Sequence, residues 1–591
     1  MPGETPRRVP ARRGFTVSYR GKTLLSAVDP LAQAERAAKA LKPLDRTLYL
    51  CPSPLLGYGL SPILNMISEN KHDSAILCVE ADEKLLEFSL EHLDPALLRN
   101  PRLAFAALDG GSGSAERICG LVRRKWGSRR FRRVETLRFN AGWRLYPELY
   151  GRLEDLLRKA AAADWGNAMT LVKLGRLYIR NALRNLASLP RSSSLSSLSL
   201  GPGPVLVLGA GPSLDGILAG LSRRFGAGAE DPVSRPFRIL CVDTALPCLR
   251  ARGIKPDLAV ALESQHWNLR DFVGLGDWEI PVAMDLSALP ATAETLGGRT
   301  FFFFTPWTEM NFFRRLGEAG LRPETFIPLG SVGLSAAAVA LRLSGSTVIA
   351  CGIDFSFTLD SYHARSSPGH REKLRRQNRF TGILNAAAAF REAAFTAVSK
   401  AGLPVRSDPA MRGYRDLFER EFAGEERLWD TSGPGLPLGL RSLSPGEALA
   451  ILAGGKPPGQ QSSAEKAPGI SIPGIDEPDI NRPGINEPGI NAPGASAAYV
   501  EKLERFVSAE TENLSRLRDL LSGKAPAGIA ELDKLLDYCD YLWAHFPDCA
   551  GTDGRRPPAT DISFLKRVRT ETDPFLAILN RTLAEIRRDA R

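Results

Sequence analysis

Short runs of apolar residues mark the middle of the chain. They occupy residues 205–208, 239–242, 258–261 and 348–351. Runs of this length without alternating polar positions are typical of strands buried on both faces, as in a parallel sheet covered by helices. After the first run, the apolar residues from Leu214 onward have the spacing of a helix. We therefore predict a central α/β domain with a Rossmann-like parallel sheet over residues 205–450.

The residues that follow these runs suit a binding site. The first run leads into the glycine turn Gly209-Ala-Gly-Pro-Ser213, and Ser213 is placed to cap the helix behind it. Glycine lets the backbone approach a ligand, and a helix N-terminus favours an anion such as a nucleotide phosphate. Asp243, Glu263 and Asp354 follow the later runs, and parallel strands would gather all these residues at one sheet edge. Such a turn also serves only to pack a helix on a sheet, and that alternative stays open.

A second α/β pattern covers residues 14–187. Apolar strands are predicted at 46–51 and 74–80, with the glycine turn Leu56-Gly-Tyr-Gly-Leu60 between them and Glu80 closing the second. This is the layout of a nucleoside-binding Rossmann half, in which the acid accepts hydrogen bonds from ribose. It looks methyltransferase-like, but no catalytic motif follows. We favour a degenerate, structural or partner-binding domain and keep an S-adenosylmethionine-binding methyltransferase as the alternative.

Two breaks in composition divide the rest of the chain. Residues 188–204 are rich in Ser, Pro and Gly and are predicted as a linker. Proline recurs every five residues within 456–496, which prevents a helix and predicts an extended tether. Residues 497–591 have helical apolar spacing and are predicted as a C-terminal helical domain suited to binding a protein. The aromatic cluster Tyr538, Tyr541, Leu542 and Trp543 is interpreted as core of that domain.

Charge and cysteine content narrow the class of protein. Lys and Arg outnumber Asp and Glu by 77 to 66, and part of the excess lies at 123–125 and 129–133. No aromatic-interleaved nucleic-acid motif accompanies these residues, so we interpret them as a solvated face and predict no nucleic-acid partner. The eight cysteines show no metal-ligand spacing, and no segment has the apolar length of a membrane span. We expect a cytoplasmic protein.

A set of motifs in the central domain resembles known families. In chain order they are Gly209-Ala-Gly-Pro-Ser-Leu-Asp215, Asp243-Thr-Ala-Leu246, Gly253-Ile-Lys-Pro-Asp257, Gly330-Ser-Val-Gly333, Gly352-Ile-Asp-Phe355 and Tyr362-His-Ala364. Their order resembles that in motility accessory factors, bacterial proteins implicated in O-glycosylation of flagellin with nonulosonic acids. The domain is also similar to bacterial CMP-sialic-acid sialyltransferases and to the archaeal 6-hydroxymethylpterin diphosphokinase-like domain. The resemblance covers about residues 200–400.

The resemblance implies a glycosyltransferase that moves a nonulosonic acid from a CMP donor to Ser or Thr of flagellin, without a metal or a tightly bound cofactor. It assigns donor binding to the two small-residue turns, with Gly209, Gly211, Pro212 and Ser213 in the first and Ser331 and Gly333 in the second. Asp243, Thr244 and Glu263 at the strand ends are predicted to bind the donor as well. Tyr362 either hydrogen-bonds the leaving phosphate or packs in its loop. The resemblance places Asp354 beside the sugar and offers His363 as the base, with His370 nearby. A role for His363 in ordering its loop is the competing interpretation.

Two further alternatives stay open. A pterin diphosphokinase would share the sheet and its turns but bind ATP, with Mg²⁺ at Asp243, Glu263 or Asp354. A non-enzymatic factor would capture flagellin through residues 497–591 without any dependence on nucleotide. The basic loop after the last strand, with Arg365, Arg371, Lys373, Arg375 and Arg376, is either a donor-binding element or a solvated helix face.

Overall fold

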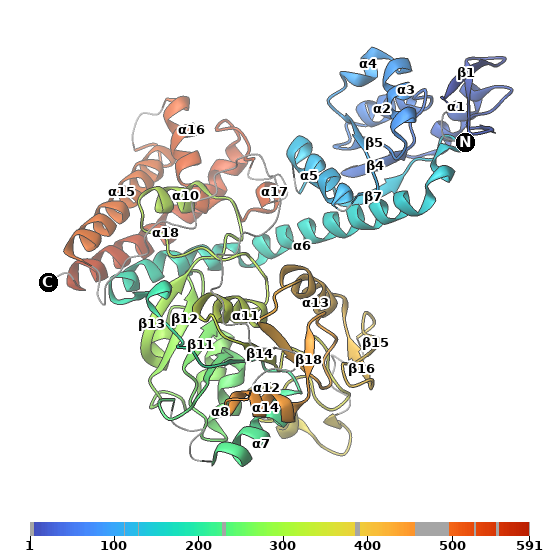
Figure 1. Ribbon diagram of the computed structural model, residues 1–591. Coiled ribbons are helices and arrows are strands. Elements are labelled where there is room, and N and C mark those ends of the chain that lie inside the picture. The colour runs from blue at the N-terminus through green and yellow to red at the C-terminus, as the bar shows by residue number, and fades with distance from the viewer. Residues whose placement is uncertain are drawn as a thin grey trace. The chain divides into compact units, whose positions relative to one another are not determined.

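The chain folds into two compact units. The computed structural model describes residues 5–111, 113–127, 129–226, 232–383, 391–455, 496–524, 528–550 and 555–589. Unit 1 comprises Met1–Arg176 and Tyr541–Phe564, and unit 2 comprises Leu177–Asp540 and Leu565–Arg591. Figure 1 shows helices and strands interleaved in both, as an α/β fold requires.

Unit 1 contains a parallel sheet in the order β6-β5-β4-β7. Its strands are β4 (Thr47–Pro52), β5 (Ala75–Glu80), β6 (Leu103–Ala107) and β7 (Arg133–Thr136). Its helices are α1 (Pro30–Ala40), α2 (Leu60–Glu69), α3 (Glu83–His92), α4 (Pro95–Leu98), α5 (Ser114–Trp126), the start of α6 (Pro147–Asn185) and α17 (Pro547–Ala550). One sheet face packs Leu77 and Val79 against α5 and α6, and the other packs Ile76 against α2. The predicted α/β character of this region is confirmed.

A small antiparallel sheet precedes that parallel sheet. It contains β1 (Arg7–Pro10), β2 (Phe15–Tyr19) and β3 (Lys22–Thr23). Val17 and Tyr19 on β2 are buried in a cluster with Leu55 and Leu85, so apolar contacts attach the sheet to the α/β part of unit 1.

Unit 2 contains a nine-stranded parallel sheet in the order β18-β17-β14-β9-β10-β11-β12-β13-β8. The strands are β8 (Ser193–Ser194), β9 (Val205–Leu208), β10 (Arg238–Val242), β11 (Leu258–Ala261), β12 (Ile280–Asp285), β13 (Gly297–Phe303), β14 (Val348–Cys351), β17 (Leu428–Thr431) and β18 (Arg441–Leu443). Strands β9 to β13 are added in one direction and β14, β17 and β18 in the other. The order therefore reverses between β9 and β14, where open α/β sheets bind ligands at the carboxyl ends of their strands.

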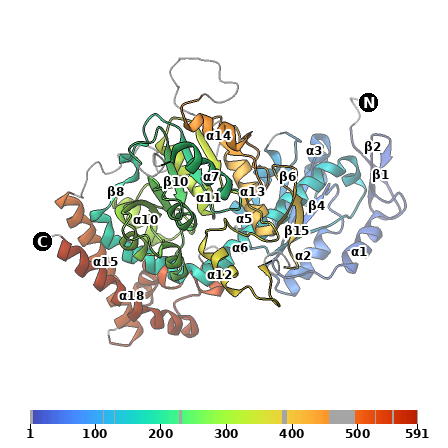
Figure 2. The same ribbon diagram turned by 90° about the horizontal axis from the view of Figure 1, so that it is seen from below.

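Helices cover this sheet and bury its apolar strands. Helix α11 (Val332–Leu343) packs on β9, β10, β11 and β14, and helix α7 (Leu214–Phe225) lies beside α14 (Pro445–Leu452), as Figures 1 and 2 both show. All four residues of β9 are fully buried. The central parallel-sheet domain predicted from the apolar runs is confirmed.

Shorter elements connect the strands of unit 2. They are α8 (Leu246–Arg250), the 3₁₀ helix η6 (His266–Phe272), α9 (Ala291–Leu296), α10 (Asn311–Glu318), α12 (Pro368–Arg376), the hairpin of β15 (Phe395–Val398) and β16 (Pro404–Ser407), and α13 (Pro409–Glu421).

The two predicted linkers differ in what the structure describes. Within 188–204, β8 pairs with β13 and Leu195 and Leu200 are buried, so apolar side chains anchor this serine-rich segment to the sheet edge. Its prediction as a simple linker is therefore wrong for this part. The proline repeat lies outside the described residues, apart from Ser496, and its tether role stays a prediction.

The C-terminal region is helical, as predicted. It contains α15 (Ala497–Leu521), α16 (Ile529–Tyr538), α17 and α18 (Ile562–Asp589). In unit 2, the Arg315 guanidinium of α10 contacts Glu510 of α15 at 2.8 Å and stacks 3.6 Å from the ring centroid of Tyr538. Tyr541, Leu542 and Trp543 are buried, which agrees with their interpretation as core residues. Among the helices that the structure describes, none is long and apolar enough to cross a membrane.

Candidate functional site

Two turns meet where the strand order of unit 2 reverses. The turn after β9 donates from Gly209 N to Cys351 O at 2.7 Å and from Gly211 N to Gly352 O at 2.8 Å. A Cβ on Gly209 would lie 2.3 Å from Gly352 O, and a Cβ on Gly352 would lie 2.3 Å from Gly209 O. Glycine is required at 209 and 352 because two backbone turns touch here. The packing interpretation of the glycine turn therefore accounts for Gly209 without a ligand.

Ser213 and Asp354 join the same two turns through side chains. Ser213 Oγ donates to Asp354 Oδ1 at 2.7 Å, Ser213 N donates to Oδ2 at 2.8 Å, and Gly352 N donates to Ser213 Oγ at 3.0 Å. Ser213 makes no side-chain cap to α7, so that prediction is wrong: the carboxylate holds its hydroxyl instead. Asp354 is only 2 % exposed, and both its oxygens face Ser213. These contacts favour a positioning role for Asp354 over the expected catalytic one.

A third loop is held on the glycine turn and carries His363. Ala364 N donates to Ala210 O at 2.9 Å, and Arg365 N donates to Asp215 Oδ2 at 2.9 Å. Both bonds use backbone N–H groups of the loop, so neither requires the imidazole of His363. The motif from 209 to 215 thus assembles three loops at the carboxyl edge of the sheet and brings His363 there.

The environment of His363 is apolar and cationic. Burial, together with the charges of Lys373, Arg270 and His370, lowers the pKa of the His363 imidazole to about 4. The imidazole is therefore neutral at pH 7 and able to accept a proton. An anion bound between Arg270 and Lys373 would offset those charges and raise the His363 pKa toward its ordinary value.

Tyr362 and His370 flank His363 in different ways. The Tyr362 ring packs 5.0 Å from the ring of Phe357 and edge-on to His363 at 4.9 Å, and the Lys373 ammonium lies 5.2 Å from its centroid. His370 is buried in the first turn of α12, where Ser367 Oγ accepts from its backbone N–H. The structure therefore brings both predicted histidines to this loop, with Tyr362 packed between an aromatic ring and a cation.

A polar cluster follows β10. Asp243 is buried, and this burial raises its pKa to about 6. Its carboxylate accepts hydrogen bonds from Thr244 N at 2.8 Å and Asn268 Nδ2 at 3.1 Å, which act in the opposite direction and lower the pKa. Thr244 Oγ1 lies 3.3 Å from Asp243 Oδ1 and 3.2 Å from Asp271 Oδ2. Asp271 Oδ1 is buried and has no hydrogen-bond partner among the described residues, and Arg270 Nε lies 3.6 Å away. Asp271 therefore adds a second carboxylate to this cluster, which sequence reasoning missed because it lies in η6 and not at a strand end.

The neighbouring acids after β11 and β12 accept hydrogen bonds from groups of the protein itself. Glu263 is half-buried, and its Oε1 accepts from Gln265 N at 2.8 Å. Asp285, which the sequence analysis did not select, accepts from the backbone and hydroxyl groups of Ser287 and Thr305. Within the described ranges, no group of three or more His, Cys, Asp or Glu side chains is arranged to hold a metal ion.

The N-terminus of α11 reaches the same edge. The helix begins after Ser331, whose side chain makes no cap, and the Ser335 N–H bonds back to Ser331 O at 3.1 Å. The amides of residues 332–334 therefore lack a partner within the helix, and with the helix dipole they favour an anion. A Cβ on Gly333 would contact Ile353 at 3.5 Å, which places this helix end beside the Gly352–Phe355 turn.

Residues remote in sequence hold the Asp354 turn in place. Lys400 Nζ and Asp430 Oδ1 form an ion pair of 2.6 Å in which each side chain is 4 % exposed. Burial raises the pKa of Asp430 to about 6, opposed by Lys400 and assisted by Asp354. Leu436 N donates to Asp354 O at 2.8 Å, so the segment after β17 holds the Asp354 turn. Neither Lys400 nor Asp430 belongs to a motif that sequence reasoning could select.

A hollow and a strained residue lie next to these turns. The hollow has a volume of about 300 Å³ and is lined by Pro212, Ser213, Gly216, Thr431, Ser432 and Gly433. Phe355 has a φ of +47°, in the left-handed region that a bulky residue rarely adopts, and Ser407 Oγ donates to its carbonyl at 2.8 Å. Such strain persists only where the surrounding contacts enforce it, and it concentrates at functional sites.

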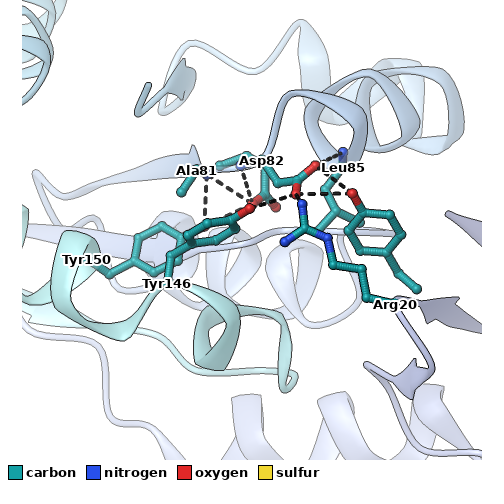
Figure 3. A network of polar contacts seen from close by, with 8 residues as sticks. Arg20, Ala81, Asp82, Leu85, Tyr146 and Tyr150 are labelled. Atoms are coloured by element: carbon teal, nitrogen blue, oxygen red, sulfur yellow. Dashed lines mark hydrogen bonds and ion pairs between the residues drawn. The ribbon is translucent and has the colours of Figure 1, made fainter. Parts of the chain in front are cut away.

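The corresponding acid of unit 1 is closed off. Glu80 is 2 % exposed, and its Oε1 accepts from Tyr150 Oη at 2.9 Å, Ala81 N at 2.9 Å and Asp82 N at 3.2 Å. Figure 3 shows the tyrosines converging on this strand end. Burial raises the pKa of Glu80 to about 7, so it is largely uncharged below neutrality. Glu80 is not placed to bind ribose, which supports the structural interpretation of this domain.

Asp82 beside it ties three parts of unit 1 together. It accepts hydrogen bonds from Tyr146 Oη at 2.9 Å, Arg20 Nη2 at 2.8 Å, Tyr19 Oη at 3.1 Å and Leu85 N at 3.2 Å (Figure 3). The network links the small antiparallel sheet, the start of α3 and the start of α6. A carboxylate with this many donors is satisfied by the protein itself.

Comparisons with known proteins agree with the α/β fold described above. Residues 180–360 match a family model described as 6-hydroxymethylpterin diphosphokinase MptE-like. An uncharacterized protein of Treponema pallidum (strain Nichols) is 28% identical over 588 residues, which cover 98% of this chain and 96% of that protein. The MAf glycosyltransferase from Magnetospirillum magneticum AMB-1 has a similar structure, with a TM-score of 0.54 over 100% of this chain and 93% of that one, at 14% identity. The chain shares the fold of that glycosyltransferase.

The likeness covers the whole chain, whereas the MptE-like match covers the part from α6 to the Asp354 and Phe355 turn. The matched part contains the glycine turn, the acidic strand ends and the N-terminus of α11. It ends just before the loop that carries His363. His363 therefore lies outside the residues that match the MptE-like model.

Proposed function

We propose that this protein is a glycosyltransferase of the motility accessory type, which transfers a nonulosonic acid from a CMP donor to Ser or Thr of flagellin in the cytoplasm. The observation that carries the proposal is the assembly of three loops at the point where the strand order of unit 2 reverses, which fixes His363 there by backbone hydrogen bonds. The fold shared with a MAf glycosyltransferase supports it.

The donor would bind along the carboxyl edge from β10 to β14. Its phosphate and carboxylate would lie near the free amides at the start of α11, where Ser331 and Gly333 are, and near Arg270 and Lys373. The ribose hydroxyls would lie near Thr244 and Asp271, with Asp243 and Glu263 behind them. Pro212 and Ser213 would border the donor next to the hollow.

The reaction would need one base. The acceptor hydroxyl oxygen forms a bond to the anomeric carbon while the bond from that carbon to the CMP phosphate oxygen breaks. His363 takes the hydroxyl proton, and CMP leaves with the bonding electron pair. Neutral His363 is ready to accept the proton, and the anionic donor raises its basicity at the moment of binding. The nearby cations stabilise the charge that develops on the leaving phosphate.

A second function is favoured by one observation, the match of residues 180–360 to the MptE-like model. On this alternative the same edge binds ATP and transfers a diphosphate to a hydroxyl, and His363 only orders its loop. The two functions differ in nucleotide and in their dependence on His363.

The test is a transfer assay on the full chain with CMP-N-acetylneuraminic acid as the donor and recombinant flagellin as the acceptor. Sialylated flagellin detected by mass spectrometry, and its loss in His363→Ala, is the expected result. Arg36→Ala, on α1 of unit 1, is the matched control and leaves the transfer unchanged. Diphosphate transfer from ATP, or equal activity of His363→Ala, would contradict the proposal.

A further inference from the structure

Exposed apolar and basic side chains lie on two elements that each bring a cation near His363. Residues 359–383 contain six Arg and Lys residues against two acids, a large share of the net charge of +11 carried by the whole chain. Leu359, Leu374 and Phe380 in the same segment are exposed, Phe380 by 78%. On η6, Trp267 is exposed by 66% and Leu269 is exposed as well. Large apolar side chains are rarely left in water without a function when they lie together.

Both elements bring a cation near His363. Arg270 of η6 and Lys373 of α12 both act electrostatically on the imidazole. The segment 359–383 is anchored through Ala364 and Arg365 to the glycine turn, so it is continuous with the candidate site. A molecule bound across η6 and α12 would therefore present its own groups to His363.

Three of the six cations in the segment are available for a partner, whereas Arg365 lies near Asp360 and Arg376 pairs with Glu372. Within the described residues, no carboxylate lies at salt-bridge distance from Arg371, Arg375 or Arg379, and all three are exposed. The basic cluster of unit 1 differs: Arg123 pairs with Asp164 at 3.2 Å and Arg130 with Asp73 at 2.7 Å. Unpaired cations beside exposed aromatic and aliphatic side chains complement an acidic surface that also has apolar groups.

We propose that η6 and residues 359–383 form the docking surface for the acceptor polypeptide, and that this polypeptide is acidic and apolar around the modified hydroxyl. The proposal rests on the proposed glycosyl transfer. It places the acceptor next to His363, whereas the sequence analysis expected docking through residues 497–591. In the described part of 496–589, the large apolar side chains that are exposed are Ile529 and Ile562, and they are isolated in sequence.

The test measures binding of a fluorescein-labelled peptide to the full chain by anisotropy. The peptide alternates Asp and Leu around one Thr, and its partner peptide carries Lys in place of Asp. We expect the acidic peptide to bind more tightly, and Arg375→Glu with Arg379→Glu to weaken it by about ten-fold or more. Leu374→Ser with Phe380→Ser should weaken it without changing its salt dependence. Arg36→Glu with Arg99→Glu, exposed residues of unit 1, is the matched charge control and leaves binding unchanged.

Equal affinity for both peptides, or equal loss in the control variant, would overturn the docking surface. Tighter binding to phosphatidylserine vesicles than to the acidic peptide would also overturn it and assign the patch to a membrane. CMP binding, followed by calorimetry on the same variants, reports separately on the proposed function. Retained CMP binding with no peptide binding rejects the docking surface alone. If the protein does not bind CMP but the acidic peptide still binds and the charge-reversal variants weaken it, the proposed transfer reaction is rejected and the docking surface is retained.

Discussion

The two parallel sheets of this protein share the same local pattern, but different contacts surround the carboxyl ends of their strands. In each, an apolar strand runs into a turn that contains glycine, a later strand ends in an acid, and the strand order reverses beside the first strand. In unit 1, Asn140 Nδ2 donates to Ser53 O at 2.7 Å across that point and Tyr150 covers Glu80. In unit 2, Ser213 and Asp354 join the turns, and a third loop adds His363.

The difference shows that the acid at a strand end does not by itself make a site. Glu80 and Asp354 are both buried; Ser213 bonds to both oxygens of Asp354, whereas the three hydrogen bonds to Glu80 all go to Oε1. The distinction lies in what surrounds them: unit 2 adds a helix N-terminus and a neutral imidazole among cations. In unit 1, tyrosines donate to Glu80 and to Asp82. We therefore assign chemistry to unit 2 and a structural role to the Glu80 network.

The largest effect should come from His363 in unit 2. His363→Ala should lower the transfer rate on the order of 10²–10⁴-fold while CMP binding is kept, because general-base catalysis contributes that much and the loop is held by backbone bonds. Single-turnover rates with CMP-N-acetylneuraminic acid measure it. Across pH 5–8 the kcat/KM for the donor should be flat, because it reports the free enzyme, in which burial and the charges nearby lower the pKa of His363 to about 4. A kcat/KM that halves near pH 6.5 would contradict this lowered pKa.

The next effect concerns the contact of the two glycine turns. Gly209→Ala should lower the free energy of unfolding by about 3 kcal/mol or more, because its Cβ would meet the backbone carbonyl of Gly352 at 2.3 Å. Gly216→Ala in the next helix is the control: nothing lies within 4 Å of its Cβ, so it should stabilise by about 0.5–1 kcal/mol. Urea unfolding of unit 2, monitored by hydrogen exchange, measures the free energy of unfolding of both variants. Equal stability of the two variants would show that the turns do not need their close approach.

A smaller effect is expected from the carboxylate that joins the turns. Asp354→Asn replaces one acceptor oxygen by an NH₂ donor that faces a donor of Ser213. This should lower the free energy of unfolding by about 1–3 kcal/mol. The double variant with Ser213→Ala should recover part of this loss, because one opposing donor is removed. Additive losses in that cycle would mean that the two side chains do not interact as described.

The smallest effect tests the structural assignment of Glu80. Its folded-state pKa is raised by burial to about 7, so the carboxyl contributes stability below pH 4.5 that is lost as pH rises through 7. Glu80→Gln cannot titrate, and should therefore be the more stable protein at pH 8 by on the order of 1–3 kcal/mol, with no difference at pH 4. Unfolding of unit 1 at both pH values measures this. A variant that loses stability at pH 8 would show that the charged form is needed.

Much of this fold is predictable because its strands are continuous apolar runs. Residues 205–208 and 348–351 are recognisable as buried strands from sequence alone, and the acids behind them mark one edge. What those acids do is not predictable. Ser213 bonds to a carboxylate 141 residues away, so local rules favour a helix cap that the fold does not form. The serine-rich segment that contains Leu195 and Leu200 has the composition of a linker, yet it buries these leucines at the sheet edge.

The support around the site is even less visible in sequence. Lys400 and Asp430 come from separate segments and meet only because β17 is placed beside β14. Asp271 follows no apolar strand, and its unpartnered oxygen is a property of packing. Sequence motifs therefore locate the edge of the sheet, while the residues that shape the site depend on tertiary contacts.

Calorimetric titration of CMP, ATP and S-adenosylmethionine into the full chain tests the assignment of chemistry to unit 2 most directly. Two variants accompany the wild type: Gly211→Val, whose Cβ would lie 2.4 Å from Asp354 Oδ2, and Glu80→Gln. We predict that CMP binds to the wild type and to Glu80→Gln but not to Gly211→Val, and that S-adenosylmethionine gives no heat. Binding of ATP in preference to CMP, or binding that is lost in Glu80→Gln and kept in Gly211→Val, would contradict this account.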